Sequence, residues 1–150
     1  MGRLVRRWTP VMGWMLLIFI GSTDVLSAKQ TSRFVVPFLL WLDPHISLDT
    51  ILRIHTVLRK MGHLVAYAVL AALLWRALRG QAAFTLKMWT PALLALVLAV
   101  IYAGFDEFHQ SLVPSRTASV RDVALDTAGA LIGLMIYWAF VLRRKPQMVY

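Results

Sequence analysis

The chain has 150 residues, of which 59% are hydrophobic, and a mean hydropathy of +0.68, whereas a soluble domain is about 45–50% apolar. It contains no cysteine, which excludes disulfide frameworks, zinc–thiolate sites and thiol nucleophiles. Its formal net charge of +9 comes from basic residues beside apolar runs rather than along one hydrophilic face, so we expect membrane lipids as partners and no nucleic acid.

These properties predict an all-α membrane protein with a single domain over residues 1–150. A helix needs about 20 predominantly apolar residues to cross the hydrocarbon core, and about four segments approach that length. We therefore predict a bundle of transmembrane helices near residues 9–26, 61–79, 88–108 and 121–142.

The first predicted span is the weakest, because its strictly apolar part, Val11–Ile20, is short. The alternative is a signal peptide, with three arginines before residue 8, the apolar run, and a possible cleavage end at Ala28. The two interpretations differ in whether this helix is kept.

A shorter apolar run, Phe34–Leu42, follows the first span and is interrupted by Pro37. Because it cannot span as a helix, we expect it to lie in the membrane interface or to form a re-entrant segment. Residues 43–59 mix charged and aliphatic side chains in a pattern typical of a short amphipathic helix on the membrane surface.

The charges predict the orientation of the chain. With four spans, nine basic and no acidic residues lie on the side of both termini, and all seven acids lie on the other side. Basic loops favour the cytoplasmic side, so we expect both termini in the cytoplasm and the polar chemistry on the outer side.

Polar side chains gather at the predicted outer ends of the second and third spans, and their spacing places several of them on shared helix faces. These residues are Lys60, His63 and Tyr67 in the second span, and Asp106, Glu107, His109 and Gln110 in the third.

The fourth span begins with Ser119-x-x-Asp122, which predicts a capping box. Asp126 lies one turn deeper, where an ionised carboxylate costs a few kcal/mol without a partner, so it is a candidate functional residue. Lys60 or Arg116 is expected to pair with Asp106 or Glu107, since helix dipoles oppose these charges at their own helix ends.

A divalent metal is a further possibility for the histidines and carboxylates. The sequence has neither the His pair four residues apart of a zinc helix nor a repeated carboxylate loop, and no phosphate-binding glycine loop. We therefore expect no metal and no cofactor.

At these residues the sequence resembles the VanZ-like family, named after an accessory protein linked to teicoplanin resistance. The resemblance implies a multi-pass protein of the bacterial cytoplasmic membrane, acting at the cell envelope and in some members associated with glycopeptide tolerance, with no named reaction. The elements that carry it are Lys60-x-x-His63-x-x-x-Tyr67, Asp106-Glu107-x-His109-Gln110, and Pro114-x-Arg116 followed by Asp122, Asp126, Gly129 and Gly133.

Three functions remain open from the sequence. A membrane enzyme acting on a lipid-linked or other envelope substrate would use histidine as general acid or base and carboxylates to orient it. A non-catalytic factor would bind or move an envelope lipid with the same pocket, and a structural protein would keep the charges as an ion-pair network. The expected catalytic residues are His63, Asp106, Glu107 and His109, and the expected substrate-binding residues are Lys60, Tyr67, Gln110, Arg116, Asp122 and Asp126.

Overall fold

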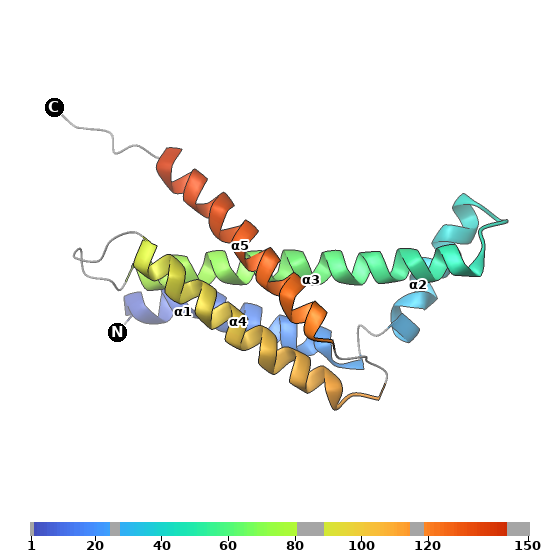
Figure 1. Cartoon of the computed structure of the whole chain (residues 1–150), viewed down its shortest axis with the longest axis horizontal. Helices are drawn as coiled ribbons and strands as arrows, with labels where there is room; N and C mark the ends of the chain where they lie inside the picture. Colours follow the sequence, from blue (N-terminus) through green and yellow to red (C-terminus); the bar gives the residue numbers. More distant parts are fainter. Residues whose placement is uncertain (1, 25–27, 81–88, 115–118, 144–150) are drawn as a thin grey trace.

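A computed structural model describes residues 2–24, 28–80, 89–114 and 119–143, which form five helices and no strand within these ranges (Figure 1). The all-α prediction is confirmed. The helices are α1 (Gly2–Ser22), α2 (Ala28–Leu42), α3 (Leu48–Arg79), α4 (Trp89–Ser111) and α5 (Val120–Arg143).

Three helices, α3, α4 and α5, are long and apolar enough to cross a membrane. The shortest of them, α4, has 23 residues and is about 35 Å long at 1.5 Å per residue, against a hydrocarbon core of about 30 Å. The chain is therefore a multi-pass membrane protein. Helix α1 has 21 residues but carries three arginines in its first two turns, and it does not meet the same criterion.

Helix α3 begins at Leu48, well before the predicted start at residue 61. Ser47 caps it, since its side chain accepts a hydrogen bond from the Thr50 N–H at 3.2 Å. No proline or glycine separates residues 48 and 61, so one helix runs from the polar segment into the apolar one. The prediction of a separate amphipathic helix over residues 43–59 is wrong, because a change of composition is not a helix stop.

The apolar run Phe34–Leu42 belongs to α2, which stays helical through Pro37. The predicted interruption at Pro37 is wrong, because a proline removes one backbone hydrogen bond and commonly kinks a helix without ending it. At 15 residues, about 22 Å, α2 is nevertheless shorter than a span. Among the described helices it contacts only α3.

The closest helix contact is between α3 and α5. A Cβ atom added to Gly129 or Gly133 would overlap the backbone carbonyl oxygens of Leu64 and Ala68, so the two backbones touch at these glycines. Small residues permit this approach in membrane helices, where packing replaces the hydrophobic effect as the main attraction. Further along α3, Trp75 is fully buried, and its ring lies 5.0 Å from Tyr137 and 5.4 Å from Trp138 of α5.

Helix α1 lies along α3 and α4 and is held by two hydrogen bonds from aromatic side chains. Trp14 Nε1 donates to the carbonyl of Ala66 at 2.8 Å, and the Tyr102 hydroxyl donates to the carbonyl of Met15 at 2.7 Å. Hydrogen bonds between helices satisfy polar groups that have no water to bond with in the hydrocarbon core. The start of α1 and the ends of α3 and α5 lie at one end of the bundle, and α2 lies towards the other (Figure 1).

Candidate functional site

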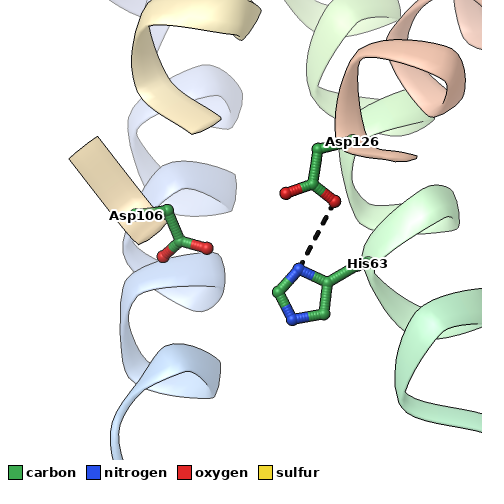
Figure 2. A group of neighbouring side chains, drawn as sticks. All are labelled: His63, Asp106 and Asp126. Carbon is green, nitrogen blue, oxygen red and sulfur yellow. Dashed lines mark ion pairs between the residues drawn. The ribbon is translucent and has the colours of Figure 1, made fainter. Parts of the chain in front are cut away.

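One polar cluster joins three helices. His63 of α3, Asp106 of α4 and Asp126 of α5 each present one nitrogen or oxygen donor, and these donors lie within 4.8 Å of one another (Figure 2). His63 Nδ1 lies 3.4 Å from Asp126 Oδ1. Residues 20 or more positions apart in the sequence thus share one site, at the part of the bundle towards the end of α4 and the start of α5.

The glycine contact explains how two of these residues meet. Asp126 lies one turn before Gly129, and His63 directly precedes Leu64, whose carbonyl abuts Gly129. Because side chains three or four residues apart share a helix face, the close approach of α3 and α5 brings the imidazole against the carboxylate.

Asp106 is held by its own helix. Gln110 Nε2 donates to Asp106 Oδ2 at 3.0 Å and lies 3.4 Å from Ser22 Oγ of α1. Gln110 and Ser22 are both 2% exposed, so this pair of bonds holds the carboxylate inside the protein. The other oxygen, Oδ1, is left for a different partner.

The two aspartates of the cluster are almost fully buried, with 4% of Asp106 and 1% of Asp126 exposed. Within the described part of the chain, three of their oxygens make no hydrogen bond: Oδ1 of Asp106 and both carboxylate oxygens of Asp126. Buried carboxylates are normally hydrogen-bonded or paired, because desolvation is costly. The chemical feature of this site is therefore a pair of buried oxygens without a hydrogen bond, Asp106 Oδ1 and Asp126 Oδ2, beside a third, Asp126 Oδ1, that faces the imidazole at 3.4 Å.

Glu107 links α4 to the start of α5. Its Oε1 accepts a hydrogen bond from the Ser119 N–H, and the Ser119 hydroxyl accepts one from the Arg121 N–H at 3.2 Å. Ser119 thus caps α5 as predicted, but the carboxylate that reaches its N–H comes from another helix. Asp122, the expected partner in the capping box, is turned elsewhere.

Asp122 faces α3, where its carboxylate lies 3.7 Å from Arg59 and 4.0 Å from Lys60. The prediction that Lys60 pairs with Asp106 or Glu107 is therefore wrong. The close contact of α3 with α5 places the first turn of α5 beside the basic residues, whereas Asp106 and Glu107 are buried on α4. Arg116, the other predicted partner, lies outside the described residues.

Two predicted site residues lie beside the cluster. The Tyr67 side chain is fully buried, with its ring 6.4 Å from that of Tyr102, and its hydroxyl makes no hydrogen bond in the part of the chain that is described. The His109 ring lies 4.5 Å from that of Phe19 in α1, and its buried Nε2 likewise has no hydrogen-bond partner among these residues. His109 therefore packs on α1 rather than joining the cluster around His63.

An apolar groove of about 900 Å³ lies between α1, α2 and α3, and His63 is one of its lining residues. Arg59 and Ser22 also line it, although no spacing in the sequence marks them as site residues. The aliphatic part of the lining comes from Leu17, Ile18, Val35, Leu52, Leu58 and Val65. His63 thus both contacts the buried carboxylate of Asp126 and lines the groove.

The family of the chain follows from its sequence taken as a whole. The model of the family described as VanZ/LLP1 matches residues 8–142. The chain belongs to the VanZ/LLP1 family. The match includes every residue of the cluster and confirms the resemblance seen in the polar motifs. Comparisons with curated proteins and with solved structures gave no significant match.

Proposed function

We propose that this VanZ/LLP1 protein binds a cell-envelope lipid with an anionic headgroup, with the lipid chain in the groove and the headgroup beside Arg59 and His63. The observation that supports this is the double position of His63, which lines the groove and also contacts Asp126. A lipid has the same two parts, an apolar chain and a polar head.

The groove suits such a ligand in size and chemistry. Its volume of about 900 Å³ falls within the roughly 300–1,000 Å³ of typical ligand sites, which are mostly apolar with a few polar groups. The guanidinium of Arg59 lies 3.7 Å from Asp122 but has more N–H donors than this one ion pair uses, so donors remain for a phosphate or carboxylate group.

A purely structural ion-pair network explains only part of the site. Asp122 with Arg59 and Lys60 is such a network. Asp106 and Asp126 are only partly paired: Asp126 forms one ion pair, with His63, while Asp106 Oδ1 and Asp126 Oδ2 make no hydrogen bond in the described structure, and an unpaired buried charge destabilises a fold. Costly polar groups inside a membrane protein are usually kept for function.

Catalysis on the same lipid is a second candidate function. The 3.4 Å contact between His63 Nδ1 and Asp126 Oδ1 is the arrangement in which a carboxylate orients an imidazole as a general base. Turnover of a lipid-linked precursor by the purified protein would distinguish this activity from binding alone.

We further propose that α1 is a fourth span, that α2 lies in the interface, and that both termini face the cytoplasm of a bacterial inner membrane. Five arginines line one concavity at the end of the bundle where α1 starts and α3 ends. None of the seven acidic residues of the chain lies within ten positions of these arginines in the sequence. This asymmetry supports the orientation through the preference of basic residues for the cytoplasmic side. The arginines are Arg3, Arg6, Arg7, Arg76 and Arg79.

Two glycines offer a matched test of lipid binding, because a Cβ atom at Gly62 or Gly104 meets nothing within 4 Å. Gly62 lines the groove and Gly104 does not. In Gly62→Leu the new side chain would occupy the groove, so we expect binding of a polyprenyl phosphate or phosphatidylglycerol to weaken at least about tenfold, the effect of losing about 1.4 kcal/mol. Native mass spectrometry of the full chain in detergent would measure it.

Gly104→Leu is the control and should bind as the wild type does. Phosphatidylcholine, whose headgroup has no net charge, should bind more weakly to all three proteins. Equal binding by Gly62→Leu and the wild type would refute the groove as the chain site. In cells, the resemblance to the VanZ-like family makes growth in teicoplanin the matching assay, with tolerance expected for the wild type and Gly104→Leu but not for Gly62→Leu.

A further inference from the structure

The cluster of His63, Asp106 and Asp126 has more negative charge than the protein around it balances. In the described structure, His63 is the only basic side chain that forms an ion pair with either aspartate. Arg59 and Lys60, the nearest basic residues on α3, are paired with Asp122. Two carboxylates therefore share one imidazole inside a membrane protein, where uncompensated charge is strongly disfavoured.

The free oxygens point into the space between the three helices. Figure 2 shows the carboxylates of Asp106 and Asp126 and the ring of His63 directed towards a common region. Both aspartates are more than nine-tenths buried, and both oxygens of Asp126 and Oδ1 of Asp106 have no hydrogen-bond partner in this part of the structure. A ligand that accepts electron pairs from all three residues would satisfy them together.

We propose that His63, Asp106 and Asp126 bind one divalent transition-metal ion, such as Zn²⁺ or Mn²⁺. Imidazole and carboxylate ligands suit these ions, and a charge of +2 balances two aspartates while histidine binds as the neutral ring. The proposal goes beyond lipid binding, since the ion needs no lipid to be held.

The distances fit such an ion. Metal–ligand bonds of about 2.0–2.2 Å place neighbouring donor atoms roughly 3–3.5 Å apart in a tetrahedral or octahedral site. His63 Nδ1 and Asp126 Oδ1 already lie 3.4 Å apart, and the donor atoms of all three residues lie within 4.8 Å. Small side-chain rotations would close the remaining difference.

One of the proposed ligands is oriented by a neighbouring residue, as is usual for metal sites. Gln110 donates to Asp106 Oδ2 at 3.0 Å and leaves Oδ1 available to the ion. Three protein ligands also leave coordination positions open, which is typical of sites where a metal ion meets a substrate oxygen. Next to the groove, that position would be available to an anionic headgroup, a consequence that rests on the proposed lipid binding.

Metal content of the full-length protein tests the proposal. The chain would be purified in detergent without a polyhistidine tag, stripped with EDTA, dialysed against Zn²⁺ or Mn²⁺ and analysed by mass spectrometry of the elements. We expect about one ion per chain in the wild type and a loss of at least about tenfold in affinity in Asp106→Asn and Asp126→Asn. Asp49→Asn, at an exposed ion pair with Arg53, is the control and should keep the ion.

A variant that preserves all three ligands covers the case in which Asp126→Asn does not fold. Gln110→Ala removes only the group that orients Asp106, and we expect it to weaken metal affinity about 10- to 100-fold. Added metal should also raise the thermal stability of the stripped wild type. A wild-type protein that takes up no ion, or an Asp49→Asn protein that loses it equally, would overturn the proposal. Because no lipid enters these measurements, either result leaves the lipid-binding test independent.

Discussion

Four acidic residues near the site have different roles because their surroundings differ. Asp122 pairs with basic residues of α3, Glu107 accepts the N–H at the start of α5, and Asp106 and Asp126 face His63 with free oxygens. The same chemical group is thus a surface ion pair, a helix cap or a potential ligand. Burial separates Asp122 from the other three, which are all buried, and position separates Glu107 from the two aspartates, because Glu107 reaches the Ser119 N–H.

His109 offers a prediction at this scale, because its ring packs on Phe19 at 4.5 Å while its Nε2 is buried without a partner in the described structure. We expect His109→Phe to unfold with a free energy within about 1 kcal/mol of the wild type, since the aromatic contact remains and an unsatisfied nitrogen is removed. His109→Ala should lose about 2–3 kcal/mol, because it leaves a cavity. Unfolding in detergent, followed by tryptophan fluorescence, would measure both.

Lipid binding by the same variants tests the role of the ring. If His109 only packs, His109→Phe should bind lipid as the wild type does. A stable His109→Phe protein that no longer binds or converts a lipid would instead assign chemistry to His109.

At the scale of helices, the crossing of α3 and α5 controls the site. Gly129 and Gly133 let the two backbones touch, and Asp126 and His63 lie one turn or less from that contact. The glycines therefore position the cluster without belonging to it. Their value lies in having no side chain, as in other close-packed membrane helices.

Gly133→Ala should destabilise the protein by about 1–3 kcal/mol, the usual penalty for forcing extra atoms into a packed interior. The added Cβ would overlap the carbonyl oxygen of Ala68, and a backbone cannot rotate away as a side chain can. Thermal unfolding of the purified protein would show the loss.

Gly104→Ala is the matched control for this change, since it also lies in a helix and a Cβ there meets nothing within 4 Å. It should be neutral or slightly stabilising, because alanine favours helices more than glycine does. Equal stability of Gly133→Ala and Gly104→Ala would show that α3 and α5 do not approach as closely as described.

In the molecule as a whole, the basic residues and the polar cluster lie at different places along the bundle. The arginine-lined concavity lies at the end of the bundle where α1 starts, whereas the cluster lies towards the end of α4 and the start of α5 (Figure 1). Helix α3, with 32 residues, is about 48 Å long and exceeds the hydrocarbon core by roughly 18 Å. It is thus longer than a single span needs, and α2 packs against it.

The proposed orientation predicts which positions are accessible from outside the cell. The chain has no cysteine, so single cysteines at positions 2, 30, 83, 115 and 148 would each be unique. An impermeant thiol reagent should label positions 30 and 115 in intact cells, because four spans place both termini in the cytoplasm. Permeabilised cells, in which all five should react, provide the control, and labelling of position 83 in intact cells would contradict the orientation.

Local properties of the sequence determined the class of the protein and much of its helical structure. The length and hydropathy of an apolar segment are enough to predict a helix in lipid, and the predicted spans near 88–108 and 121–142 agree with α4 and α5 to within three residues at each end. The start of α3 at Leu48 was missed because the composition changes near residue 60 without a helix breaker. Spacing on single helices also selected His63, Asp106 and Asp126 as candidates.

Which of these candidates meet depends on how the helices pack. The separation of residues along the chain does not fix their distance in space when they lie on three different helices, so no spacing motif could show three side-chain nitrogen and oxygen atoms within 4.8 Å of one another. The predicted partner of Lys60 is wrong for the same reason, since the approach of α5 to α3 places Asp122 beside Lys60. The groove likewise exists only because α1, α2 and α3 lie side by side. The sequence of a helix determines which side chains lie on each of its faces, and the packing of the helices determines which partners those side chains meet.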